Sequence, residues 1–337
     1  MTIREELEKM ERETLSPYAT LSVNTKGRER EEEQCDVRPV FQRDRDRILH
    51  CKAFRRLKNK TQVFLTPKGD HYRTRLSHTL EVSQNARTIA KALRLNEDLV
   101  EAIALGHDMG HTPFGHAGEY VLNEICEDGF RHNEQSVRIV EKLEKNGMGL
   151  NLTWEVRDGI LNHQSKSMPH TLEGKVARLS DKIAYVYHDV DDAIRAEILT
   201  EDDIPLEIRK TLGFTTKQRL NTLIHNVIMN SMNQDDIRMS ADIQEAMFEL
   251  RHFMFDHVYT NPIAKGEEVK AKAMIRQLFG FYKDHIEFLP EKYLAMLDEG
   301  EKTERVICDY IAGMTDQYAI TKFSEYFLPQ AWQVDGY

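Results

Sequence analysis

The sequence has 337 residues, of which 40% are hydrophobic and 30% charged, a composition typical of a globular protein with a sizeable core. Its net charge of -10 argues against broad nucleic-acid binding through a basic surface, and no C-x-x-C pair indicates a zinc knuckle. The charged N-terminus and the lack of a long apolar run argue against a signal peptide and a membrane span, so we expect a cytoplasmic protein.

The N-terminal part of the chain is predicted to form a helix, a linker, a second helix and a hairpin. Apolar spacing predicts an amphipathic helix over Ile3–Thr14, and the charge-dense stretch Asn24–Arg38 is interpreted as a mobile linker. Arg43–Lys60 is predicted as one amphipathic helix with a basic face. Gln62–Arg73 is predicted as a β-hairpin around a turn at Pro67–Asp70, and this is the one strand signal in the sequence.

The basic face of Arg43–Lys60 has two interpretations. A run of charge is often only a solvated surface. Alternatively, the cations at its end bind a phosphate chain, or an allosteric nucleotide at a subunit contact. The sequence leaves both interpretations open.

The remainder of the chain is predicted to be helical. Apolar residues recur at helical spacing, Asn96 is a plausible N-cap, and glycines and prolines separate the segments. We therefore expect an all-α protein with one minor hairpin. The predicted helices are Arg75–Leu93, Glu97–Asp108, His116–Ile125, Asn133–Asn146, Trp154–Asn162, Leu172–Arg195, Thr216–Met232, Ser240–Val258, Gly266–Ile286 and Lys302–Tyr318.

The stretch His107–Glu119 concentrates histidines and carboxylates at the joint between two predicted helices. Buried His and Asp side chains must be ion-paired, hydrogen-bonded or bound to a metal. A polar loop with satisfied histidines is the simplest alternative. The density of ligand-type side chains favours a functional site over that alternative.

A metal site is indicated when two more residues are considered with this stretch. Each of the candidate ligands lies on or at the end of a predicted helix. Two imidazoles and two carboxylates suit Mn²⁺, Fe²⁺, Zn²⁺ or Mg²⁺ and leave positions open for water and a substrate oxygen. The four candidates are His78, His107, Asp108 and Asp181.

A polar stripe begins at Asp181. Asp181, Tyr185 and Asp189 recur at i, i+4 and i+8 and share one side of a helix, with Lys182 beside them. The stripe is interpreted either as solvent-facing or as a docking face for a polar ligand.

His116 and Glu119 also share a helical face. A carboxylate beside an imidazole raises the imidazole pKa and fixes its tautomer. The pair is a candidate general acid or positioning dyad. His111 and His132 are further candidates for phosphate contacts.

Four stretches together resemble the HD superfamily of metal-dependent phosphohydrolases, and most closely its deoxynucleoside triphosphate triphosphohydrolase branch, which includes the bacterial dGTPase-like proteins. The resemblance covers residues of about 40 to 195 and implies an HD-domain helical bundle with additional C-terminal helices. It divides the chain into residues 1–40 (N-terminal helix and linker), 41–200 (catalytic core) and 201–337 (C-terminal helices). The stretches are FQRDRDRILHCKAFRRLKNKTQVF from Phe41, RTRLSHTLEV from Arg73, GHDMGHTPFGHAGE from Gly106 and LSDKIAYVYHDVDDA from Leu179.

The resemblance also implies a role for each matching residue. His78, His107, Asp108 and Asp181 would hold one divalent ion, foremost Mn²⁺ or Mg²⁺, with Fe²⁺, Co²⁺, Ni²⁺ or Zn²⁺ as alternatives. His116, backed by Glu119, would be catalytic. Substrate contacts would come from Arg75 and His111 at the α-phosphate, Lys182 at the outer phosphates, Gln62 and Asp189 at the sugar 3′-hydroxyl, Tyr185 at the deoxyribose, and His132 at a phosphate.

The predicted reaction is hydrolysis of a deoxynucleoside triphosphate to a deoxynucleoside and inorganic triphosphate. Members of the branch are usually homo-oligomers, and some need an allosteric nucleotide. One alternative is another HD-type reaction, as a nucleotidase or cyclic-nucleotide phosphodiesterase with a second metal. Another is a nucleotide-sensing protein without turnover. The sequence does not fix the base preference.

Overall fold

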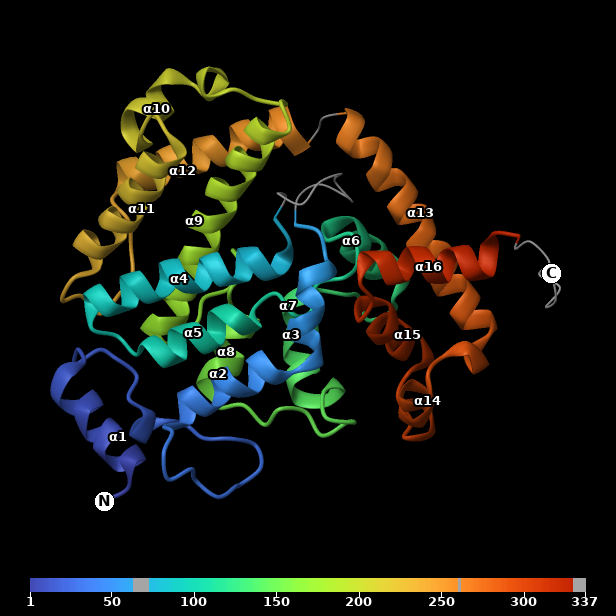
Figure 1. Ribbon diagram of the computed structural model, residues 1–337, viewed down its shortest axis with the longest axis horizontal. Coiled ribbons are helices and arrows are strands. Elements are labelled where there is room, and N and C mark those ends of the chain that lie inside the picture. The colour runs from blue at the N-terminus through green and yellow to red at the C-terminus, as the bar shows by residue number, and fades with distance from the viewer. Residues whose placement is uncertain (63–72, 260–261, 330–337) are drawn as a thin grey trace, which may run out of the picture.

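The computed structural model of the protein describes residues 1–62, 73–259 and 262–329, and helices joined by loops make up these ranges (Figure 1). They contain no strand, and only an isolated antiparallel bridge joins Thr61 to Thr74. Most of the predicted hairpin, residues 63–72, lies outside the described residues. No described helix is both long enough and apolar enough to cross a membrane.

The α-helices and the short helical turns between them have the following bounds. The α-helices are α1 Ile3–Thr14, α2 Val40–His50, α3 Lys52–Arg56, α4 Arg75–Leu93, α5 Glu97–Gly106, α6 His116–Ile125, α7 His132–Arg138, α8 Trp154–Leu161, α9 Leu172–Arg195, α10 Leu206–Leu212, α11 Thr216–Ser231, α12 Ala241–Met254, α13 Pro262–Asp284, α14 Glu291–Asp298, α15 Thr303–Ala312 and α16 Asp316–Phe327. The 3₁₀ and π-helical turns are Ser22–Asn24, Leu57–Asn59, Ile139–Leu143, Glu201–Asp203, Phe255–Tyr259 and Ile286–Phe288.

The all-α prediction is confirmed, and α1, α4, α6 and α9 have the predicted bounds. The single helix predicted over Arg43–Lys60 is wrong, because the chain is extended at Cys51 (φ −77°, ψ 159°), between α2 and α3. The thiol of Cys51 accepts the Phe54 N–H, and Glu144 accepts the N–H groups of Lys52 and Ala53. These contacts satisfy the exposed amide groups of a new helix start.

The C-terminal predictions were less accurate than those in the core. The helix predicted over Lys302–Tyr318 is two helices, α15 and α16, which are separated at Gly313. The short helices α10 and α14 were not predicted. Both begin directly after a proline, Pro205 or Pro290, which is a favourable residue at a helix start.

The segment interpreted as a mobile linker is held against the core by ion pairs. Arg28 pairs with the buried Asp44, and Glu32 pairs with Arg43 and Arg47 of α2. Its polar side chains therefore face partners on the core as well as solvent.

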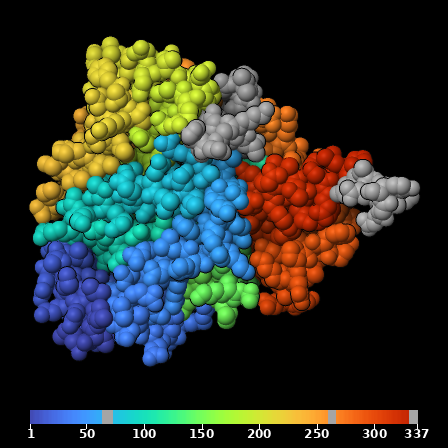
Figure 2. Space-filling model, viewed as in Figure 1, coloured from blue at the N-terminus to red at the C-terminus, as the bar shows by residue number. Residues whose placement is uncertain are grey.

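Among the described residues, three large buried apolar clusters and a small one of Val82, Ala104 and Ala184 hold the helices together. One joins α4 and α9 to α10–α12, and a second joins α2, α3, α5 and α8. The third joins α6 to α13–α16, which form the orange and red lobe beside the core in Figure 2. Helices α4, α5 and α9 also pack against one another. The predicted metal ligands lie on these three helices or directly after α5.

Candidate metal centre and active site

The four predicted metal ligands lie side by side in the structure. His78 comes from α4, His107 and Asp108 follow α5, and Asp181 comes from α9. Asp181 Oδ1 lies 3.1 Å from His78 Nε2 and 3.5 Å from His107 Nε2, and Asp108 Oδ1 lies 3.4 Å from His107 Nε2. Segments that are far apart in the sequence are therefore brought together: ligand atoms of His78, His107 and Asp108 lie within 4.8 Å of one another, and Asp181 lies against both imidazoles.

The donor set fits a divalent cation. His107 Nδ1 donates to the carbonyl oxygen of Ala104 at 2.6 Å, which leaves the buried Nε2 as a lone-pair donor without a hydrogen-bond partner. Ligands about 2.1 Å from an octahedral ion, at right angles to each other, are about 3 Å apart, close to the spacing observed here. Although burial disfavours a charged imidazole, Asp108 and Asp181 raise the pKa of His107 to about 9. The two carboxylates therefore favour a positive charge at this centre, which a bound cation would supply in place of the imidazole proton.

Asp108 is fixed by two further contacts. Its Oδ2 accepts a hydrogen bond from Arg75 Nη1 at 2.8 Å, and its Oδ1 lies 3.2 Å from His111 Nε2. Burial alone would raise the pKa of Asp108, but His107, His111 and Arg75 hold it well below the usual value. Arg75 is thus an ion-pair partner of a predicted ligand, and its predicted α-phosphate contact remains a prediction.

His78 has supporting contacts behind it that were not predicted from the sequence. His78 Nδ1 lies 3.1 Å from His188 Nδ1, and the other ring nitrogen of His188 contacts Glu81. Such a partner fixes the tautomer and the orientation of a metal-binding imidazole. His188 lies seven residues after Asp181 in α9, and that helical spacing was the available signal.

The loop between α5 and α6 depends on glycines. Phe114 and Gly115 have positive φ angles of 62° and 55°, and α6 begins at His116 directly after them. A Cβ atom at Gly110 would lie 2.2 Å from the carbonyl oxygen of His132 and 2.3 Å from the amide nitrogen of Ser136. The loop therefore packs directly on the start of α7.

Gly110→Ala is expected to lower the free energy of unfolding by about 1–3 kcal/mol, because backbone atoms on the neighbouring helix must move. Gly280→Ala in α13 is the control, since no described atom lies within 4 Å of its Cβ position. That control is expected to be neutral or to stabilise by up to about 1 kcal/mol. Urea denaturation of both variants measures the difference. Equal midpoints would contradict the packing argument.

The histidines predicted as catalytic or substrate-binding form one cluster. Glu119 lies 3.1 Å from His116 Nδ1 and 2.8 Å from His132 Nδ1. The ring of His111 stacks on that of His132, with centroids 3.8 Å apart. Burial would raise the pKa of Glu119, but hydrogen bonds with His116 and His132 hold it well below the usual value. The His116 side chain is 69% exposed, so it can reach a group bound from solvent.

Lys182, Tyr185 and Asp189 continue along α9 from Asp181. Burial, with Arg178 and Arg251 nearby, lowers the pKa of Lys182 to about 8. Burial raises the pKa of Tyr185 and of Asp189 well above the usual values. The solvent-facing interpretation of this stripe is therefore wrong for Asp189, which is fully buried.

Gln62 lies close to the loop at residues 107–115 between α5 and α6, hereafter the catalytic loop. A Cβ atom at Gly115 would be 3.8 Å from the Gln62 carbonyl oxygen and 2.9 Å from Arg75 Nη2. The Gln62 side-chain oxygen is buried without a hydrogen-bond partner. Gln62 is therefore close to the start of α6, where His116 lies.

The fold and these residues define a metal-dependent phosphohydrolase of the HD class, because residues 75–186 match the HD domain and residues 237–325 match the phosphohydrolase-associated domain. The chain belongs to the family of deoxyguanosinetriphosphate triphosphohydrolase-like proteins. It is 57% identical to the protein of that name from Caldanaerobacter subterraneus subsp. tengcongensis, over 98% of both chains. It is 49% identical to the one from Clostridium perfringens strain 13, over 98% of this chain and 99% of that protein.

Among solved structures, a phosphohydrolase from Bacteroides thetaiotaomicron has a similar fold. The TM-score is 0.52 and the sequence identity is 16%, over 84% of this chain and 69% of the other. At this identity the likeness supports the fold alone.

Proposed function

We propose that this protein hydrolyses deoxynucleoside triphosphates to a deoxynucleoside and inorganic triphosphate. The main support is that the divalent-metal donor set lies beside two features suited to this chemistry. They are the His116–Glu119 pair, which clusters with His111, and Lys182, the neighbour of Asp181 on α9. The relatives named above are consistent with this substrate class, since they are deoxyguanosinetriphosphate triphosphohydrolase-like proteins.

Charge is the first requirement for binding such a substrate. A nucleoside triphosphate carries a charge of about -4, and a chain of net charge -10 repels it at long range. Lys182, Arg178 and Arg251 provide local positive charge beside the metal donors. A near-surface ion pair at about 4 Å contributes about 4 kcal/mol at an effective dielectric constant of 20. These cations suit the outer phosphates, and Lys182 is the one next to a metal ligand.

The residues around the reacting phosphorus have separable roles. His78, His107 and Asp108, together with Asp181 beside the two imidazoles, would hold a divalent ion, which would supply charge neutralisation and water activation. Water attacks the α-phosphorus and the 5′-oxygen leaves. His116 donates a proton to that oxygen, and Glu119 fixes the orientation of its ring. His111 is oriented towards the same centre by Asp108.

The sugar would be recognised by residues from two segments, the one that precedes α4 and helix α9. Gln62 and Asp189 are the proposed partners of the 3′-hydroxyl, and Tyr185 packs against the deoxyribose. Asp189 is buried, and burial raises its pKa, so its carboxyl group can donate a hydrogen bond to a hydroxyl as well as accept one. His132, held by Glu119, is the proposed further phosphate contact.

The test is direct assay of each of the four deoxynucleoside triphosphates, singly and mixed, with Mg²⁺, Mn²⁺ and other divalent ions. Release of inorganic triphosphate supports the proposal, and release of phosphate or pyrophosphate alone contradicts it. Elemental analysis should give one metal per chain. Two metals per chain would favour another HD-type reaction, since Asp108, His111 and His132 form a second group of clustered donor atoms.

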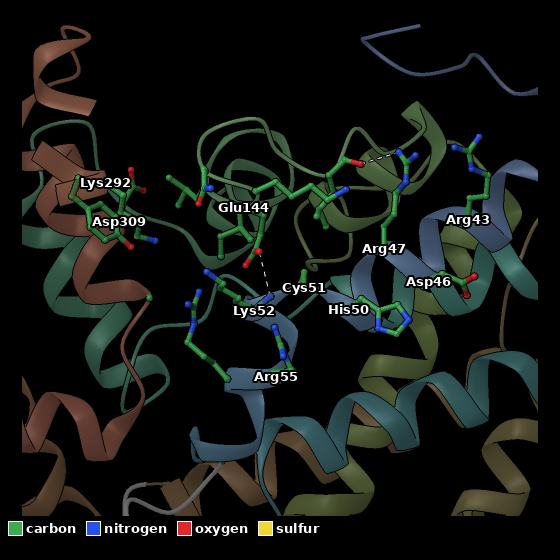
Figure 3. A pocket seen from close by; sticks show the side chains of 18 of the residues that line it. Arg43, Asp46, Arg47, His50, Cys51, Lys52, Arg55, Glu144, Lys292 and Asp309 are labelled. Atoms are coloured by element: carbon green, nitrogen blue, oxygen red, sulfur yellow. Dashed lines mark hydrogen bonds between the residues drawn. The ribbon is translucent and has the colours of Figure 1, made fainter. Parts of the chain in front are cut away.

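We also propose that an activating nucleotide binds in a basic pocket of about 500 Å³ between α2, α3 and the C-terminal helices (Figure 3). Its volume is in the range of small-molecule sites. Within the described residues, Lys52 and Arg55 form no ion pair, and like charges add to the burial that lowers the pKa of Lys292. The cations that line it include Arg43, Arg47, Lys52, Arg55, Arg56 and Lys292.

Arg55→Glu is expected to raise the nucleotide concentration needed for half-maximal activation by about tenfold or more, because a charge-assisted contact is replaced by repulsion. Titration of a second nucleotide at fixed substrate concentration measures it. Lys9→Glu, at a lysine that is 61% exposed on α1, controls for the change in net charge. An unchanged activation midpoint in Arg55→Glu would contradict this assignment.

We propose that the protein assembles as a homo-oligomer, and light scattering after size-exclusion chromatography tests this.

A further inference from the structure

The C-terminal helices reach into the catalytic region through one buried carboxylate, Asp316 at the start of α16. We propose that Asp316 is a positioning residue that fixes the catalytic loop relative to the substrate-binding segment, Thr61 and Gln62. This inference rests on the proposed function. Asp316 is 3% exposed, and both of its carboxylate oxygens accept hydrogen bonds from residues of the core.

One oxygen holds the catalytic loop. Asp316 Oδ1 accepts the backbone N–H of Phe114 at 2.9 Å, across 202 residues of sequence. Phe114 has a φ angle of 62°, a conformation that non-glycine residues adopt at an energetic cost. The N–H bond to Asp316 stabilises that conformation. Since His116 follows two residues later, the direction in which α6 starts depends on this contact.

The other oxygen holds the substrate-binding segment. Asp316 Oδ2 accepts the backbone N–H of Thr61 at 3.0 Å and the Thr61 hydroxyl at 2.7 Å. Gln62, the proposed partner of the sugar hydroxyl, is the next residue. Thr61 also forms the β-bridge to Thr74, which caps the helix that carries His78. Asp316 thus forms hydrogen bonds with both the catalytic loop and the substrate-binding segment.

A buried lysine connects the same parts of the molecule. Lys60 is 2% exposed, and its Nζ donates hydrogen bonds to the carbonyl oxygens of His111 and of Ala312, the latter at 2.8 Å. Ala312 is the last residue of α15 and His111 lies in the catalytic loop. The joint between α15 and α16 is therefore connected to the catalytic loop twice, directly by Asp316 and indirectly through the Lys60 side chain. The four metal donors come from the core alone, so this joint should affect turnover and substrate binding without affecting the metal.

Asp316→Asn tests the proposal, because asparagine keeps the size of the side chain but replaces one acceptor oxygen with an NH₂ group. We expect kcat to fall on the order of 10- to 100-fold, as misplacement of a catalytic group does, with a higher KM. Metal content should equal that of the wild type. Thr61→Val removes only the hydroxyl contact and should raise KM with kcat retained. This split between kcat and KM would not follow from a general loss of stability.

Asp44→Asn is a matched control. Asp44 is also buried, and its Oδ2 accepts the backbone N–H and the hydroxyl of Thr153, both at 2.7 Å, away from the catalytic loop. We expect both Asp→Asn variants to lower the melting temperature, but only Asp316→Asn to change kcat and KM. Equal kinetic constants in the two variants would overturn the proposal, as would wild-type KM in Thr61→Val if Asp316→Asn does not fold.

Hydrogen exchange separates failure of this proposal from failure of the proposed function. Peptides that cover residues 58–62 and 112–118 should exchange faster in Asp316→Asn than in Asp44→Asn. If the wild type releases no triphosphate, the proposed function fails, but faster exchange in these peptides still supports the structural role of Asp316. Unchanged exchange in both peptides would refute that role whatever reaction the protein catalyses.

Discussion

Asp181→Asn is expected to remove the divalent ion and to lower triphosphate release by about 10³-fold or more, because metal-ion catalysis contributes several kcal/mol. Asp181 Oδ1 is the donor that faces both His78 Nε2 and His107 Nε2. Burial would raise the pKa of Asp181, but the neighbouring imidazoles of His107 and His78 hold it well below the usual value. An amide can offer only a neutral oxygen to the ion. Elemental analysis after dialysis measures the loss of metal. Single-turnover assays measure the loss of triphosphate release.

Asp191→Asn on the same helix is the control for this experiment. Asp191 is 30% exposed and pairs with Arg73 and Arg195 rather than with a metal donor. Its replacement removes the same formal charge from α9 and should leave the metal content unchanged. If Asp181→Asn retained both metal and turnover, the assignment of the metal centre would be wrong.

His116→Ala is expected to lower kcat by about 10²- to 10⁴-fold, the usual contribution of a general acid, with little change in metal content. The His116 ring is exposed and is oriented by Glu119, whose other oxygen contacts His132. Removal of the imidazole leaves the 5′-oxygen to depart without a positioned proton donor. Steady-state kinetics with a deoxynucleoside triphosphate measures the change in kcat.

A substrate with a better leaving group on the α-phosphorus, such as a nitrophenyl ester, should be less sensitive to His116→Ala, because its departure needs no proton. His170→Ala is a matched control. His170 is 67% exposed, and its Nδ1 lies 2.8 Å from Asp158, much as His116 lies beside Glu119. A similar loss of kcat in both variants would show that the effect is not specific to the catalytic cluster.

Local sequence was sufficient to predict most of the core helices. The bounds of α9 follow from apolar residues at helical spacing and from Thr171, whose hydroxyl accepts the Gly174 N–H. The break at Cys51 could not be predicted in this way, because no glycine or proline marks it. It depends on Glu144, 91 residues away from Ala53, which accepts amide hydrogens at the new helix start.

In the candidate site too, contacts within one helix could be predicted from the sequence and contacts between distant segments could not. The spacing of Asp181, Tyr185 and Asp189 placed them on one side of a helix, and the proximity of His116 to Glu119 followed from their positions in one helical turn. The contacts of Arg75 with Asp108, and of His188 with His78, join different helices, and their partners could not be read from local spacing.

The sequence by itself determined the helical class, the extent of the central helices and the identity of the metal-donor and catalytic candidates, because each depends on residue type and on interactions within a few turns. Only the tertiary structure decided that His188 and Glu81 support a metal ligand and that Asp316 contacts the catalytic loop. The physical reason is that hydrogen bonds between segments separated by 110 or 202 residues depend on how whole helices pack, which no local pattern encodes.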